Sequence, residues 1–519
     1  MSTRHDGEPN AMLPYRRATS ENHGARGKVI AYHFSLQPSR FAQAGSLGLA
    51  VALAGLFLTT ACKPSHQEAK DVKLAQSQLD LPTPSPQQQK VADAHLDWNM
   101  ETLVGAYEKV GLKSPKWDSA ARTALKHFAQ VRAYGPNVEG FPTQIRNYTS
   151  MAVNAGCNDP LIKYLHGRFV LDASRKTPEQ MAEIWEEIVN GLESSSYPEI
   201  RKFYVHAQAK EIYDHLKPLP PQWGDHIRIA QQHLVAALAD KSIPPIEVDE
   251  AGHRFLSLIE RVRADQKKQA YDEMAALLEK RWPKAALTYL LEGEFYVEYA
   301  WDGRSSKMAD KVTPEQWKLF AERLATSEKL LLKGAALNPK EGRIPATMIK
   351  VVSGQGKGYP EMRQWFEKAM DADPNNYTAC NNLLYFLLPR WYGSREMMLA
   401  FGRECATSEK WGGTVPLTLS DAHELYYRFD GPKDLSYWQQ PEVWPDIRTA
   451  FDKFFARNPN ATSWRHNYAR YAWWCQQWDV LQEQLKLMGD NVNYEYFGGE
   501  AEFQKMADEA KKHAPAAAK

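Results

Sequence analysis

The sequence lacks the short motifs by which many enzymes and metalloproteins are recognised. Its five cysteines include no C-x-x-C pair, and its fifteen histidines include no H-E-x-x-H motif. There is also no G-x-S-x-G elbow, no P-loop and no G-x-G-x-x-G fingerprint. From motifs we therefore expect no catalytic residue, no metal site and no cofactor.

The chain also has no excess of charge of one sign. It carries 64 Lys and Arg against 63 Asp and Glu, for a net charge of +1. A protein that binds nucleic acid needs a basic surface or stripe. We therefore expect no nucleic-acid partner.

Strand signals are nearly absent between Val91 and His513, whereas helix signals recur. The run Thr177-Pro178-Glu179-Gln180 has a capping Thr, Pro at the first helical position and Gln three residues after the cap. The same four residues return at 313–316. Gly167 and Gly293 lie inside helical patterns, where glycine is tolerated if a second helix approaches closely. The sequence predicts an all-α protein.

Part of this helical body resembles tetratricopeptide repeats. Phe366-x-x-Ala369-x-x-x-x-Pro374 has the aromatic, small residue and proline of the second repeat helix, and Phe451 to Pro459 keeps that spacing. Asn338, Asp373 and Asn458 precede the prolines, where a helix is expected to stop. The resemblance implies a right-handed solenoid of helix hairpins, preceded by a helical N-terminal part.

The stretch 289–405 also resembles an uncharacterised bacterial family with tetratricopeptide-like helices. The resemblance depends on the segments 299–304, 354–356, 365–366 and 389–394, which read YAWDGR, GQG, WF and PRWYGS. It supports the fold and implies no activity.

An export segment precedes this body. Residues 42–61 carry no charge and follow Arg40, which is the layout of a signal peptide. The run ends at Cys62 after Leu-Thr-Thr-Ala, which resembles a bacterial lipobox, so we expect a lipid on Cys62. The absence of Asp after that cysteine favours the periplasmic face of the outer membrane. The alternative is an uncleaved anchor in the inner membrane, because the run is long enough to span a bilayer.

These features predict four segments along the chain. Residues 1–61 form an N-terminal extension and signal peptide. Residues 62–90 are rich in Gln, Ser and Pro and form a flexible tether, because they hold little apolar surface to bury. Residues 91–245 form an N-terminal helical domain, and residues 246–515 form a tetratricopeptide-like domain.

The other four cysteines are Cys157, Cys380, Cys405 and Cys475. We interpret them as small buried residues of helices. If a disulfide exists, we expect it between Cys380 and Cys405.

A stripe of carboxylates is the first candidate site. Glu294, Glu298 and Asp302 share one helix face, with Trp301 and Arg304 beside them. Such a stripe could bind a divalent cation or perform acid–base chemistry, as in an envelope hydrolase or a metal-binding enzyme. The other interpretation is a solvated face, or a network that ties this helix to its neighbour.

Exposed aromatics are the second candidate. Trp391 and Tyr392 lie in a loop-like stretch, where they could form a groove for a peptide or glycan or could plug the end of a helical stack. Taken together, the sequence favours a lipid-anchored envelope scaffold that binds a protein, peptide or other envelope macromolecule and is not an enzyme. The hydrolase or metal-binding enzyme remains the alternative.

Overall fold

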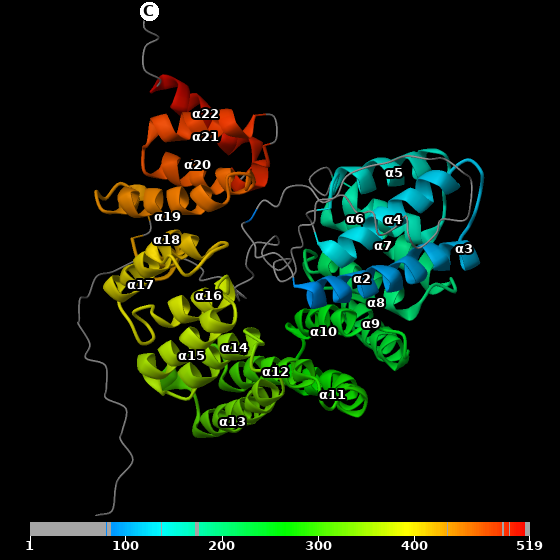
Figure 1. The fold of residues 1–519 in the computed structure, drawn as a ribbon, viewed down its shortest axis with the longest axis horizontal. Coiled ribbons are helices and arrows are strands. Elements are labelled where there is room, and N and C mark those ends of the chain that lie inside the picture. The colour runs from blue at the N-terminus through cyan, green and yellow to red at the C-terminus, as the bar shows by residue number, and fades with distance from the viewer. Residues whose placement is uncertain are drawn as a thin grey trace, which may run out of the picture. The chain divides into compact units, whose positions relative to one another are not determined.

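A computed structural model describes residues 79, 85–135, 138–171, 176–432, 434–489, 492–497 and 499–513. These residues fold into a succession of helices and contain no β-strand (Figure 1). The prediction of an all-α helical solenoid is confirmed, and its right-handedness stays a prediction. The expected leader at 1–61 and the expected lipid-attachment residue Cys62 lie outside the described residues.

The helices follow one another with short connections. In the N-terminal part they are α2 (Pro86–Met100), the π-helix η2 (Glu101–Gly105), α3 (Ala106–Val110), α4 (Asp118–Tyr134), α5 (Thr143–Asn154), α6 (Pro160–Phe169), α7 (Pro178–Glu193), α8 (Glu199–Tyr213) and α9 (Pro221–Ala239). In the middle they are α10 (Pro245–Ile259), α11 (Ala264–Arg281), α12 (Ala286–Arg304), η4 (Ala309–Lys311), α13 (Pro314–Leu337), α14 (Arg343–Gly354), α15 (Gly358–Ala372) and α16 (Tyr377–Phe386). In the C-terminal part they are α17 (Arg395–Thr407), η5 (Val415–Leu417), α18 (Thr418–Phe429), η6 (Leu435–Tyr437), α19 (Val443–Arg457), α20 (Trp464–Trp474), α21 (Trp478–Met488), η7 (Tyr494–Phe497) and α22 (Glu500–Lys512).

The helix starts and stops follow the expected signals. Thr177 and Thr313 both form capping boxes, in which the Thr side chain and the Gln three residues later satisfy each other's backbone N–H groups. Helix α2 has the same device at Ser85, so residues 86–90 at the end of the expected tether are helical. Helices α13, α15 and α19 end before the Asn or Asp that precedes each repeat proline.

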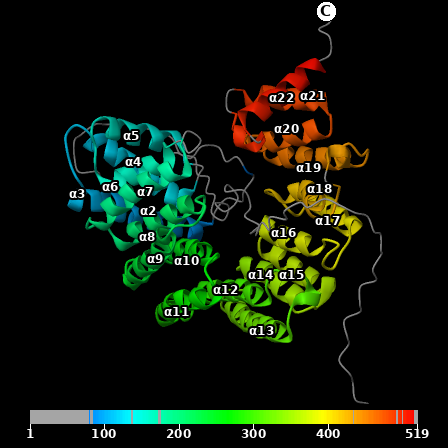
Figure 2. The ribbon, with the colours of Figure 1, turned by 180° about the vertical axis from the view of Figure 1, so that it is seen from behind.

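Two helical glycines mark places where helices approach closely. A Cβ on Gly293 would lie 2.5 Å from a side-chain carbon of Leu331 on α13, and one on Gly167 would lie 2.8 Å from Ile188 on α7. The two ribbon views agree in placing α12 beside α13 (Figure 2). The short residue therefore lets the helices pack, as the sequence predicts.

The helices bury several hydrophobic clusters. One extends from Ala92 on α2 to Phe295 on α12, and the next from Ala286 on α12 to Ala422 on α18. Phe366 of the repeat-like motif is fully buried in the second cluster, which stabilises the fold by about 1.5–3 kcal/mol. The change from one cluster to the next falls on α12, and the domain boundary at 245–246 stays a prediction.

The four described cysteines are buried and free. The Cys380–Cys405 disulfide is not formed, although the two thiols are in hydrogen-bond contact and burial, with Cys380 beside it, raises the pKa of Cys405. Among the described helices, none is long and apolar enough to cross a bilayer.

Candidate functional site

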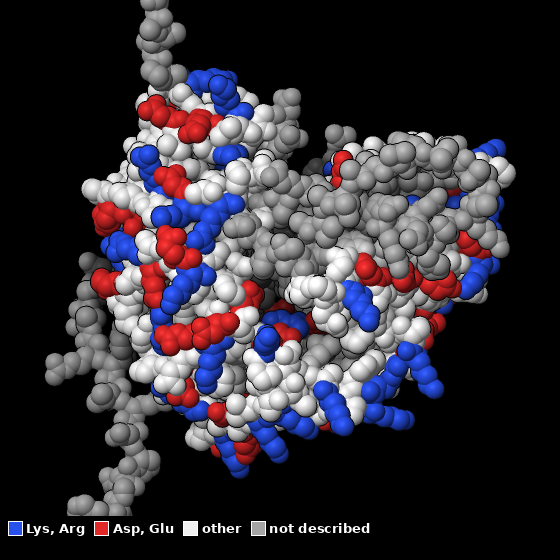
Figure 3. Space-filling model, in the orientation of Figure 1, with Lys and Arg blue, Asp and Glu red and all other residues white. Residues whose placement is uncertain are grey.

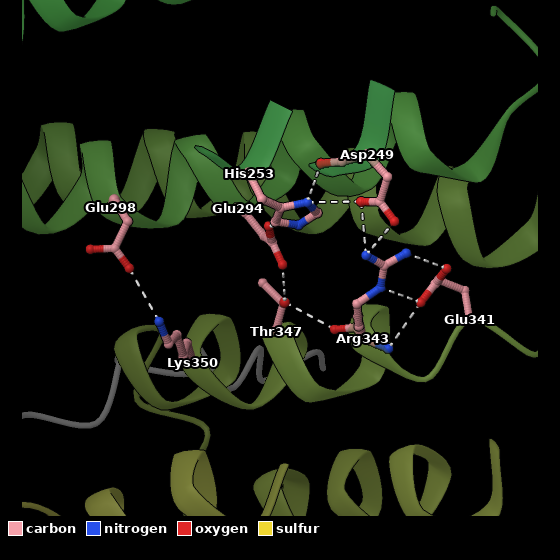
Figure 4. A network of polar contacts seen from close by, with 8 residues as sticks. All are labelled: Asp249, His253, Glu294, Glu298, Glu341, Arg343, Thr347 and Lys350. Atoms are coloured by element: carbon pink, nitrogen blue, oxygen red, sulfur yellow. Dashed lines mark hydrogen bonds and ion pairs between the residues drawn. The ribbon is translucent and has the colours of Figure 1, made fainter. Parts of the chain in front are cut away.

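Two carboxylates of the α12 stripe, Glu294 and Glu298, face α10 and α14 (Figure 4). Spacings of three or four residues within each helix place the polar side chains on one face of that helix. Each side chain contacts a group on another helix or on the turn before α14. The network consists of Asp249, His253, Glu294, Glu298, Glu341, Arg343, Thr347 and Lys350.

His253 lies at the centre of this network. Its Nδ1 is 2.8 Å from Oδ1 of Asp249, and its Nε2 is 2.9 Å from Oε2 of Glu294. Burial disfavours the imidazolium, but the two carboxylates outweigh that effect and raise the pKa of His253 well above its ordinary value. His253 is therefore a cation at neutral pH that joins α10 to α12.

Arg343 links the other end of the network. Its Nη1 lies 2.9 Å from both carboxylate oxygens of Asp249, while its Nε and Nη2 donate to Glu341 over 2.7 and 2.8 Å. The planar guanidinium thus holds two carboxylates by its two edges. Burial raises the pKa of Asp249, but His253 and Arg343 together hold it lower, at about 2.

The three carboxylates of the stripe do not converge on one point. Glu294 pairs with His253, Glu298 lies 3.2 Å from Nζ of Lys350, and Asp302 lies 2.5 Å from Nζ of Lys267. Because each has its own cation, none is left as a free base or as an open cation ligand. The arrangement ties helices together and gives no support to the hydrolase or metal-binding enzyme.

The sequence identifies the carboxylate stripe of α12 but not the residues that pair with these carboxylates. Asp249 and His253 are four residues apart on α10, a spacing that could have indicated an acid–histidine pair. Arg343 lies 94 residues from Asp249, so its role depends on the packing of α10 against α14.

Two of the aromatic candidates, Trp301 and Trp391, come together. The rings of Trp301 and Trp391 are 5.8 Å apart at 76°, which brings the end of α12 to the loop after α16. The Tyr392 hydroxyl donates to the backbone oxygen of Ser353. Trp301 and Trp391 are half-buried, while Tyr392 is exposed at the surface.

Arg304 lies among these rings without an acidic partner. Its guanidinium is 5.5 Å from the centroid of Trp301 and 5.1 Å from that of Trp317. Its Nη1 donates to the backbone oxygens of Ser305 and Lys307, and no described carboxylate lies within ion-pair distance. Burial lowers the pKa of Arg304. The indole N–H of Trp391 likewise has no acceptor among the described residues.

Two other groups of His and Glu side chains are close enough to share a metal ion: His95, Glu247 and Glu250, and Glu193, His206 and His233. In the first, Nη2 of Arg132 lies 2.8 Å from Glu247 and 2.5 Å from Glu250, so a guanidinium already supplies the cation. The second contains no Lys or Arg in ion-pair contact among the described residues.

Charges on the surface are mixed. On the face shown in Figure 3, basic and acidic side chains are interspersed over the helices. This distribution matches the balanced composition of the sequence.

A family described as "Domain of unknown function (DUF4034)" matches residues 344–411. The match runs from α14 to the turn after α17 and overlaps the stretch 289–405 that resembles an uncharacterised family. No curated protein matches the chain.

Proposed function

We propose that this chain is a cell-envelope lipoprotein whose helical-repeat body binds a protein through a carboxylate-bearing segment of that partner. The observation that carries the proposal is Arg304, a largely buried residue whose guanidinium pairs with no described carboxylate. Two backbone oxygens and two aromatic rings contact the guanidinium, and its planar fork matches the geometry of a carboxylate.

The surroundings of Arg304 suit an interface. Nε and Nη2 have no acceptor among the described residues, so they remain available to a ligand. Trp301, Trp391 and Tyr392 supply the aromatic area that is enriched, together with Arg, where binding energy concentrates. The Trp301, Arg304, Trp391 and Tyr392 side chains are called the aromatic–arginine cluster below.

Site-specific photocrosslinking in intact cells tests the binding. A photoreactive amino acid at Tyr392 should form a protein adduct that Arg304→Met abolishes and Arg304→Lys weakens. Leu487, which is 48% exposed on α21, is the control position. The same adduct from Leu487, or an adduct that Arg304→Met leaves unchanged, would refute the proposal.

Mass spectrometry of the mature N-terminus tests the anchor separately. A lipidated Cys62 is expected in the membrane fraction. An intact segment 42–61 would instead favour the inner-membrane anchor, and recovery from the cytosol would end the envelope assignment.

A further inference from the structure

Three helices bring Glu193, His206 and His233 together. Glu193 is the last residue of α7, His206 lies in the middle of α8 and His233 lies on α9. Oε1 of Glu193 is 3.0 Å from Nε2 of His206 and 2.7 Å from Nε2 of His233. The two imidazoles therefore present the same ring nitrogen to one carboxylate oxygen.

We propose that Glu193, His206 and His233 bind a divalent transition-metal ion such as Zn²⁺. Two imidazole nitrogens and one carboxylate oxygen form a set that such ions prefer, with water in the remaining position. This site lies on helices other than those of the aromatic–arginine cluster and does not depend on the proposed binding function.

Each imidazole also has a partner for its other nitrogen. Nδ1 of His233 lies 2.6 Å from Oε2 of Glu199, the first residue of α8. Nδ1 of His206 lies 3.0 Å from Nδ1 of His226. Metal-binding histidines are commonly fixed in this way, because a carboxylate or another acceptor holds the second ring N–H.

The placement of hydrogens favours the metal. If neutral His233 donates from Nε2 to Glu193, then its Nδ1 lone pair faces the Glu199 carboxylate at 2.6 Å. Two acceptors at that distance repel each other. If Nε2 instead binds a metal ion, the hydrogen moves to Nδ1 and donates to Glu199.

The same reasoning applies to the contact between His206 and His226. A hydrogen on Nε2 of His206 would make its Nδ1 an acceptor from His226, leaving a lone pair of His226 facing Glu186 at 3.4 Å. With a metal on Nε2 of His206, the hydrogen of His206 lies on Nδ1 and is donated to Nδ1 of His226. The hydrogen of His226 then lies on Nε2 and points to Glu186. An extra proton on His233 would let it donate to both Glu193 and Glu199 but would leave the conflict between His226 and Glu186, whereas one metal ion removes both.

The charges around the site point the same way. Glu186, Glu193 and Glu199 all face the imidazoles, while the nearest cation that contacts Glu193, Lys202, bonds only to its backbone oxygen.

Metal titration of the full chain, purified without a histidine tag, tests the site. We expect one equivalent of Zn²⁺ to bind, and Co²⁺ to give the visible absorption of a site with nitrogen and oxygen ligands. Failure of the wild-type chain to bind, or a cobalt–thiolate band, would overturn the proposal.

Matched variants locate the ion. Glu193→Gln and His233→Gln should each weaken Zn²⁺ binding by more than about 100-fold, and Glu199→Gln by about 10–100-fold, as expected for an outer-shell partner. Glu187→Gln, on the same helix but paired with Lys163, is the control and should bind as the wild type does. Wild-type affinity in Glu193→Gln, with its fold verified by circular dichroism, would refute the assignment.

Discussion

Two groups of histidine and glutamate in this protein share residue types but differ in their cation. In the first, His95 and Glu247 are fully buried, and Arg132 lies against the carboxylate. In the second, the described side chains that contact the Glu193 carboxylate are the two imidazoles of His206 and His233. The first group contains a permanent positive charge, that of Arg132. In the second group, the described side chains that contact the carboxylate are imidazoles, which carry no permanent charge.

The difference shows that residue type alone does not distinguish an ion-pair network from a ligand site. What decides is whether a Lys or Arg reaches the carboxylate, since a permanent guanidinium occupies the position a metal ion would take. The network around His253 is of the first kind, because Arg343 and Lys350 fill it. Substitution of Arg132 and of Arg343 tests this distinction, because each removes a guanidinium that pairs with a carboxylate.

Removal of Arg132 should have the largest effect. Arg132→Met leaves the Glu247 carboxylate, which is fully buried, without its guanidinium. Breaking one side of a buried pair costs about 3–5 kcal/mol, so we expect a loss of that size in the free energy of unfolding from urea denaturation.

Arg122→Met is the matched control for Arg132→Met. Arg122 pairs with Glu108 and Asp118 near the surface, and its own side chain and that of Glu108 are about two-fifths exposed. Its loss should cost less than about 1 kcal/mol. Equal losses in the two variants would show that burial does not separate these pairs.

Removal of Arg343 should have an intermediate effect. Its side chain is 35% exposed, but it contacts Asp249 and Glu341 at once. We expect Arg343→Met to lose about 1–3 kcal/mol of unfolding free energy, because solvent screens part of the charge that is left. Arg343→Lys keeps the charge without the planar fork and should recover only part of the loss. Full recovery would mean that charge alone, and not the two-sided fork, holds α10 to α14.

Much of the fold was predictable because local signals agree with the packing. The capping boxes at Thr177 and Thr313, the helix stops and the close approach at Gly293 all follow from spacing along the chain. These features depend on residues a few positions apart, for which the helix geometry is fixed.

The site chemistry was harder to predict, because its partners lie far apart in sequence. Glu247 lies 115 residues from Arg132, and Glu193 lies 40 residues from His233. The spacing of the stripe at Glu294 was visible, but whether each carboxylate is free or paired depends on α10, α11 and α14. The fifteen histidines have no short motif, so the meeting of His206 and His233 required the structure.

The charge on His253 predicts a pH dependence. Its pKa is raised on folding above the ordinary 6.5, so its stabilising contribution is complete below that pH and is lost as the pH rises toward the folded pKa. Wild-type unfolding free energy should therefore exceed that of His253→Gln by more at about pH 6 than at about pH 9. The comparison of both chains by urea denaturation at the two pH values measures this. A difference that is constant or grows with pH would show that His253 is neutral in the folded protein.

The smallest effect is expected at Glu298, whose side chain is 52% exposed and pairs with Lys350 across 3.2 Å. Solvent screens such a pair, and ordering two long side chains offsets its attraction, so Glu298→Gln should change the unfolding free energy by less than about 0.5 kcal/mol. Urea denaturation beside Arg343→Met provides the measurement. The two substituted residues lie in the same network, so a difference in unfolding free energy between the variants reports their different solvent exposure and not their place in the fold. A loss at Glu298 as large as that at Arg343 would mean that the network acts as one unit, in which even an exposed pair supports the buried ones.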